Sequence, residues 1–245
     1  LPNPSPKAAN VNGPVVQARR ALLVVSAGLK KHGNPKYGAL YQFLESSGAS
    51  SAREGLSGVY GKVVVLEGRD GTVDKFLNTL YSLARNYDAV DLVLHQHGLP
   101  GQLVFEDKAV SVEDLGKSIK EGNNNSLNSL GKMPESSRRH LRLVWETACY
   151  GQSHANGWIK AGFQMAVGAR GVHADSMASF PAFVSWWRSG YSVLRTTEAA
   201  NRADSARLLD RWAAGPLGFK DVNSERVITG MPSKGDLTIG SPPWP

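Results

Sequence analysis

Asp91-Leu92-Val93-Leu94-His95-Gln96-His97-Gly98 is the stretch of this sequence that decides the fold. Its first half is a short, apolar, β-branched run, which is typical of a buried strand in a parallel sheet. Its second half places two histidines and a glycine directly after that strand. In open α/β sheets, functional side chains gather beyond the carboxyl ends of the strands. The stretch therefore predicts both a parallel sheet and the edge at which its site lies.

A second strand of the same kind begins at Leu141 and leads into Thr147-Ala148-Cys149. Three more short apolar runs predict further strands, at 21–25, 62–66 and 163–167. Helical spacing of apolar residues predicts helices at 37–46, 72–86, 112–121, 180–190 and 192–214, and 102–112 predicts a small hairpin. Strands that alternate with helices favour an α/β fold with a mostly parallel central sheet and helices on both faces.

The chain shows no internal repeat and no clear linker, so we expect one main domain at 15–232. Residues 1–14 are rich in Pro and Asn, and residues 233–245 are rich in Gly and Pro. Both compositions favour irregular structure. The sequence therefore predicts an irregular N-terminal segment, one domain, and an irregular C-terminal tail.

The composition is that of an ordinary soluble protein, with 245 residues, 41% hydrophobic residues and a net charge of +7. Its densest basic clusters are only pairs: Arg19-Arg20, Lys30-Lys31 and Arg138-Arg139. No aromatic residues interleave with them as a stacking platform for nucleic acid would require. No apolar run approaches the roughly 20 residues of a membrane span. We therefore expect no nucleic-acid partner and no membrane span, and the oligomeric state stays open.

The chain begins with Leu1 rather than Met, and an export signal that has been removed would fit this start. We therefore expect an exported protein, periplasmic or secreted. Cys149 is the single cysteine, so an intramolecular disulfide and a zinc site built on several cysteines are excluded. A lone thiol in an exported protein raises the question of whether it is reactive.

Thiol catalysis needs a nucleophile, a group that carries protons, and donors for the oxyanion. Cys149 supplies the nucleophile and His97 the acid–base group, because each follows the end of a predicted strand. The backbone N–H groups of Gly98 and Cys149 are the candidates for the oxyanion. His95 is the rival of His97, although it lies nearer the strand body and lacks the adjacent glycine.

These two blocks, 91–98 and 143–151, resemble those of the clan CD cysteine peptidases, which include caspases, metacaspases, legumain, gingipains and clostripain. An apolar strand ending in His-Gly and a second ending in Ala-Cys carry the resemblance. Cys149 follows His97 by 52 residues, close to the caspase spacing of about 50. Glu146-Thr147-Ala148-Cys149 is nearest to the legumain-like form, and the full caspase pentapeptide is absent. The resemblance implies a caspase-like fold and cysteine endopeptidase activity on a peptide or protein substrate, with no cofactor.

Two other functions compete with this one. Gly151-Gln152-Ser153-His154-Ala155 is close to the nucleophile elbow of α/β-hydrolases, which would make Ser153 the nucleophile. That reading lacks a histidine in the last 72 residues to complete a triad. The second competitor is a caspase-like domain that binds but does not cleave.

The resemblance also implies that residues after the fifth predicted strand help to form the pocket for the substrate residue before the cut, P1. Asp175 is the only acid in the segment 168–177, and with Ser176 it is our candidate for substrate binding. A carboxylate there predicts a basic P1 residue. Two alternatives stay open: Arg170 would favour an acidic P1, and Asp175 would cap the next helix. A legumain-like enzyme would select Asn. We expect no metal site, because Asp70, Gly71 and Asp74 are too few for a calcium loop of the EF-hand type, and a calcium dependence like that of metacaspases stays open.

Overall fold

The computed structural model describes residues 18–122, 131–230 and 237–242. A six-stranded sheet runs through the centre, with strand order β2-β1-β3-β7-β8-β9. The first five strands in this order are parallel, and β9 is antiparallel to β8. The strands are β1 (Arg20–Ser26), β2 (Lys62–Glu67), β3 (Ala89–His95), β7 (Leu141–Glu146), β8 (Met165–Ala169) and β9 (Arg226–Gly230). A separate small sheet contains β4 (His97–Leu99), β5 (Gln102–Val104) and β6 (Ala109–Ser111).

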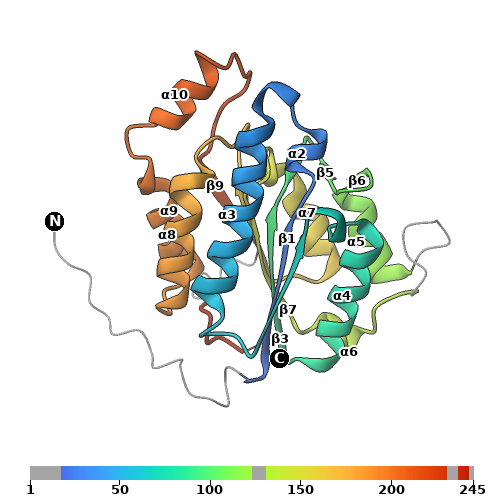
Figure 1. The fold of residues 1–245 in the computed structure, drawn as a ribbon. Coiled ribbons are helices and arrows are strands. Elements are labelled where there is room, and N and C mark those ends of the chain that lie inside the picture. The colour runs from blue at the N-terminus through green and yellow to red at the C-terminus, as the bar shows by residue number, and fades with distance from the viewer. Residues whose placement is uncertain (1–17, 123–130, 231–236, 243–245) are drawn as a thin grey trace.

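Helices cover both faces of the central sheet (Figure 1). One side carries α3, α8 and α9, and the other carries α4, α5, α6 and α7. The helices are α2 (Leu29–His32), α3 (Gly38–Leu56), α4 (Val73–Asn86), α5 (Val112–Glu121), α6 (Glu135–Arg138), α7 (Gly151–Ala161), α8 (Ser176–Arg188), α9 (Val193–Ala203) and α10 (Leu208–Ala214). This α/β architecture confirms the predicted fold class and is consistent with a caspase-like fold.

The alternation of side chains along β1 divides the core into two layers. Leu23 and Val25 pack toward α4, α5 and α7, whereas Leu22 and Val24 pack toward α3 and α8. All seven residues of β1 are buried, as expected for a strand with neighbours on both sides and helices on both faces. The sheet thus holds the strand ends rigidly, which positions the residues that follow them.

Several predicted boundaries differ from the observed ones. Helix α3 continues to Leu56, ten residues past the predicted end, and the predicted helix 192–214 is divided into α9 and α10. Strands β4 and β9 were not predicted. The expected irregular segment 1–14 lies outside the described residues, as do 123–130. In the tail, Leu237 and Ile239 have no regular structure, yet both are buried in the core.

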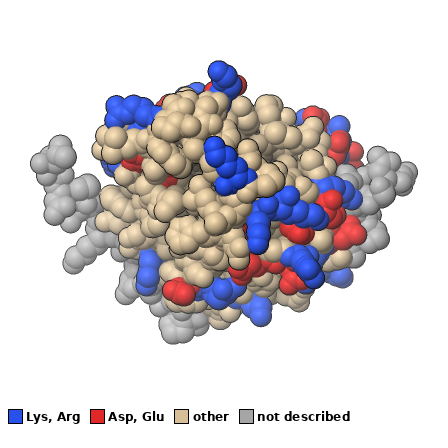
Figure 2. Space-filling view, turned by 45° about the horizontal axis from the view of Figure 1, so that its top comes forward, with Lys and Arg blue, Asp and Glu red and all other residues tan. Residues whose placement is uncertain are grey.

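No helix in the described part of the chain is long and apolar enough to span a membrane. Figure 2 looks onto the molecule with the carboxyl ends of the parallel strands brought forward. Blue Lys and Arg side chains lie near the middle of this face as well as at its edges, and a broad area on its left half carries no charge.

Candidate active site

Strands β3 and β7 bring His97 and Cys149 to the same edge of the sheet. The two strands are parallel neighbours, and Leu94 pairs with Glu146. His97 and Cys149 each lie three residues beyond this pair. Both residues are partly exposed. Two residues 52 positions apart in the chain therefore leave adjacent strands at the same level, as the sequence predicts.

Gly98 allows the two segments to touch. A Cβ atom at position 98 would lie 2.2 Å from the carbonyl oxygen of Cys149, far inside van der Waals contact. Gly98 lies in β4, opposite Leu103. Only glycine permits this approach, and it places the backbone of Gly98 against that of Cys149, the two candidate oxyanion donors.

A backbone carbonyl and an aromatic ring orient His97. Its Nε2 lies 3.0 Å from the carbonyl oxygen of Leu29, which can only accept a hydrogen bond, so the Nε2 atom carries a proton. The ring packs edge-on against Tyr41, with ring centroids 5.0 Å apart. Burial lowers the pKa of His97, and the Leu29 carbonyl opposes this shift. His97 is therefore a neutral imidazole at neutral pH, and its Nδ1 atom holds the lone pair that can accept a proton.

A strained turn presents Cys149. Tyr150 adopts a left-handed conformation with φ of 58°, and its N–H donates to the Gly171 carbonyl at 2.8 Å. The backbone N–H of His173 donates to the Cys149 sulfur at 3.3 Å. Burial raises the pKa of the Cys149 thiol, and the N–H of His173 opposes this shift. At rest the thiol of Cys149 and the imidazole of His97 are thus both neutral, so a proton acceptor has to generate the thiolate.

His95, the rival of His97, is buried against α3, one helical turn beyond the Tyr41 that packs on His97. Its Nε2 lies 2.9 Å from the Leu44 carbonyl oxygen, and its Nδ1 lies 2.5 Å from Thr147 Oγ1. Burial lowers its pKa to about 4, although the Leu44 carbonyl opposes the shift. With both nitrogens occupied, His95 ties α3 to the segment that precedes Cys149 and has no free nitrogen for catalysis.

A buried ion pair supports the Cys149 turn from the α7 side. His154 Nδ1 lies 2.6 Å from Glu146 Oε2, and its Nε2 lies 2.8 Å from the Leu99 carbonyl oxygen. Both nitrogens face acceptors, as in a charged imidazolium. Burial lowers the pKa of His154, but Glu146 outweighs this effect and the net shift is upward. The pair connects β7, α7 and the end of β4.

Asp175 and Ser176, the two candidate substrate-binding residues, lie in different surroundings. Asp175 is fully buried, and its carboxylate forms an ion pair with Arg226 and a hydrogen bond of 2.8 Å with His173 Nε2. Burial would raise its pKa, but His173 and Arg226 outweigh this and hold the pKa well below its usual value. Its charge is already balanced inside the protein, so this structure does not present it to a basic P1 residue. Asp175 immediately precedes α8, but its side chain does not cap the helix. Ser176 lines a surface pocket.

Ser153 does not occupy a nucleophile elbow. Its hydroxyl donates to the Tyr150 carbonyl at 2.7 Å and accepts from the N–H of Gly101 at 2.8 Å. The left-handed residue of the sharp turn is Tyr150, which follows Cys149 directly. The geometry of an elbow therefore presents the cysteine, and Ser153 fastens the loop after β4 to the start of α7.

Three groups at the site were not assigned a role from the sequence. They are Tyr41, the Leu29 carbonyl and the backbone N–H of His173. A backbone group leaves no residue-type signal, and Tyr41 lies on a helix whose face toward the site has no distinctive spacing. Within the ranges that the structure describes, no group of three or more His, Cys, Asp or Glu side chains is placed to hold a metal ion.

The fold and the site define a class: an α/β protein with a caspase-like sheet and a His–Cys pair at the carboxyl ends of adjacent strands. Comparison with protein-family models finds no match for this chain, and comparison with curated proteins finds no relative either.

Proposed function

We propose that this chain is a cysteine endopeptidase in which Cys149 is the nucleophile and His97 the acid–base group. The observation that carries the proposal is the equal position of the two residues, each three residues beyond the paired Leu94 and Glu146. The partial exposure of both residues supports it further, because a substrate has to reach them.

The proposed reaction begins when His97 Nδ1 takes the thiol proton and the Cys149 sulfur attacks the substrate carbonyl carbon. The oxyanion that forms accepts hydrogen bonds from the N–H groups of Gly98 and Cys149. The C–N bond then breaks, and His97 gives its proton to the leaving amine, which leaves a thioester on Cys149. A water molecule then attacks this thioester while His97 takes a proton from the water. The C–S bond breaks, the acid product leaves, and His97 returns the proton to the Cys149 sulfur.

The Leu29 carbonyl fits this mechanism. It fixes the proton on Nε2 of His97, so the other nitrogen is always the one that exchanges protons. It also favours the imidazolium that forms during each half of the reaction, since that hydrogen bond strengthens when the ring is charged. The neutral resting pair avoids the cost of holding two separated charges in a partly buried site.

The single cysteine makes the test direct, because a thiol reagent has only Cys149 to modify. Peptidyl acyloxymethyl ketones label a cysteine by a substrate-like attack, whereas iodoacetamide labels an accessible thiolate without needing a peptide-binding site. We expect the ketone to label the wild type. In the His97→Ala variant, the ratio of the ketone labelling rate to the iodoacetamide labelling rate should be at least tenfold lower than in the wild type. Reaction with iodoacetamide alone, without peptide cleavage, would instead support a binding domain that does not cleave.

A further inference from the structure

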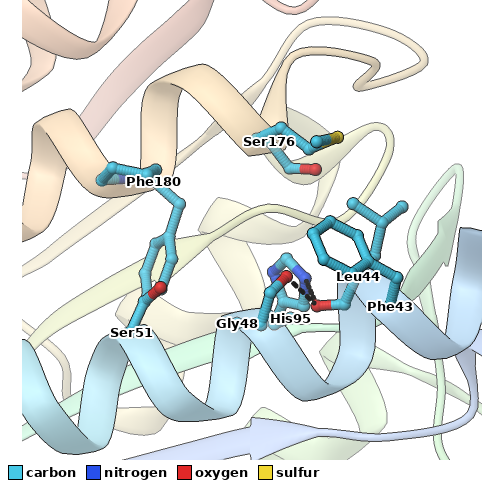
Figure 3. Close-up of a pocket in the computed structure, with 10 residues that line it drawn as sticks. Phe43, Leu44, Gly48, Ser51, His95, Ser176 and Phe180 are labelled. Atoms are coloured by element: carbon cyan, nitrogen blue, oxygen red, sulfur yellow. Dashed lines mark hydrogen bonds between the residues drawn. The ribbon is translucent and has the colours of Figure 1, made fainter.

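A small pocket opens between α3 and α8, beside the candidate active site (Figure 3). Its volume is about 110 Å³. Helix α3 contributes Phe43, Leu44, Ser47, Gly48 and Ser51, and α8 contributes Ser176, Met177, Phe180 and Pro181. The ring of His95 lies between the two helices, against α3, and completes the wall.

Three connections place this pocket next to Cys149. His95 bonds the Thr147 hydroxyl, and Thr147 precedes Cys149 by two residues, a span of at most about 7 Å. Ser176 follows closely after His173, whose N–H reaches the Cys149 sulfur. Tyr41, which touches the His97 ring, lies one helical turn before Leu44. The pocket is therefore within reach of a side chain on the residue that Cys149 attacks.

The pocket offers no partner for a charged group. None of the ten residues that line it is Asp, Glu, Lys or Arg. His95 uses both of its nitrogens within the protein. Gly48 keeps this arrangement, because a Cβ there would lie 2.5 Å from the His95 ring. A lysine or aspartate entering the pocket would lose water without gaining an opposite charge.

The size of the pocket restricts what it can hold. A cavity of roughly 150 Å³ accommodates benzene in an engineered protein. At about 110 Å³, this pocket matches a smaller, aliphatic group. Phe43 and Met177 are about half exposed, 53% and 52%, so apolar side chains also stand where a substrate side chain would enter.

We propose that this pocket binds the P1 side chain and selects an uncharged aliphatic residue up to the size of leucine or methionine. This inference rests on the proposed peptidase function and replaces the basic P1 preference that Asp175 suggested in the sequence. Asp175 is turned away into its ion pair with Arg226, whereas Ser176, its neighbour, lines the pocket.

The test is a peptide library with every residue at P1, cleaved by wild type and by two pairs of variants. We expect wild-type kcat/KM for Leu or Met at P1 to exceed that for Arg, Lys, Asp or Glu by more than tenfold. Ser51→Leu fills the pocket, so cleavage after Leu and Met should fall at least tenfold relative to cleavage after Ala. Ser47→Asp adds a carboxylate and should raise cleavage after Lys and Arg relative to Leu.

Ser46 is the matched control, because it lies on the same helix but is exposed and does not line the pocket. Ser46→Leu and Ser46→Asp should keep the wild-type profile. A wild-type profile centred on Arg, Lys, Asp, Asn or Glu, or one without preference, overturns the P1 assignment and leaves the peptidase proposal standing. If no peptide is cleaved and no ketone probe labels Cys149, the peptidase proposal fails, and the P1 assignment fails with it.

Discussion

Both ends of the central sheet contain buried charged pairs, but only those at the carboxyl end lie next to the candidate catalytic residues. At the amino end, Arg142 on β7 forms a fully buried ion pair with Asp91 on β3. Arg142 also donates to the carbonyl oxygen of Ser241 at 2.5 Å, and Arg20 donates to that of Gly240 at 2.6 Å. At the carboxyl end, the buried charges of Glu146–His154 and Asp175–Arg226 flank the partly exposed His97 and Cys149.

The two networks of buried charges should therefore have different roles, one in stability and the other also in activity. The amino-end network binds the segment 237–241 and the hydroxyl of Tyr60, which donates to Asp91 at 2.6 Å, and it contains none of the candidate catalytic residues. The carboxyl-end network fixes two turns that carry reactive side chains. Substitutions at the amino end should therefore change the free energy of unfolding alone, and substitutions at the carboxyl end should also change activity.

The largest expected effect is at the reactive pair. Cys149→Ala and His97→Ala should each lower kcat/KM for peptide hydrolysis by about a thousandfold or more, or about 4 kcal/mol of transition-state stabilisation. Their melting temperatures should stay close to that of the wild type, because both residues are partly exposed at the edge of the sheet. Activity that survives Cys149→Ala and is lost in Ser153→Ala would support the α/β-hydrolase mechanism.

At the amino end, Asp91→Ala should reduce the free energy of unfolding by about 3–5 kcal/mol, because it leaves the buried charge of Arg142 without its partner. The activity of the folded fraction should not change. Urea unfolding followed by an activity measurement on the same sample checks both statements. Asp88→Ala is the control: Asp88 also pairs with an arginine, Arg19, but at the surface, where the loss should be much smaller. Equal losses in the two variants would contradict the distinction.

Much of this fold follows from the sequence, because the buried strands are short, apolar runs between helical segments. The candidate pair follows as well, since two apolar runs lead into His-Gly and Ala-Cys. Strand β9 is harder to predict: it packs antiparallel at the edge of the sheet, and its residues are only partly buried apart from Arg226. A half-exposed edge strand lacks the apolar run that marks the central strands.

The sequence indicates that buried charged pairs exist, but it does not show which residues pair with each other. Asp91, Arg142 and Glu146 interrupt otherwise apolar strands, and a charge in such a position needs a partner. Which charges meet depends on strand order and on residues as far apart as Asp175 and Arg226. Asp175 illustrates the consequence, because the sequence offered it to the substrate while the fold gives it to Arg226.

Two buried histidines at the carboxyl end should give pH effects of opposite sign. The folded-state pKa of His95 is lowered to about 4, so the unfolded chain binds this proton first as the pH falls below about 6.5. Wild type should therefore lose up to about 3 kcal/mol between pH 6.5 and 4 from this residue, and His95→Gln should lose correspondingly less. The folded-state pKa of His154 is raised, so its contribution is present in acid and is lost as the pH rises through that pKa.

Urea unfolding at pH 7 and at pH 4.5 measures both effects. On acidification, His95→Gln should lose less stability than wild type, and His154→Gln should lose more. Both variants replace a buried imidazole at the carboxyl end of the sheet, one on β3 and one on α7, so each is the control for the other. If the change in the free energy of unfolding between pH 7 and 4.5 were altered in the same direction in both variants, the opposite pKa shifts would be contradicted.

The smallest expected effect distinguishes the two hypotheses for P1. If Asp175 recognised a basic P1 residue, Asp175→Asn would selectively reduce cleavage after Arg and Lys by more than tenfold. In the structure, Asp175 instead holds His173, whose Nδ1 lies 2.6 Å from the Thr147 carbonyl oxygen and whose N–H reaches the Cys149 sulfur. Loss of its charge should therefore loosen the support of Cys149 and lower kcat for every substrate alike, while the ratio between P1 residues changes less than about twofold. Parallel kcat/KM measurements on Leu, Lys and Asp peptides check this, and a selective loss after Lys would return Asp175 to the substrate-binding site.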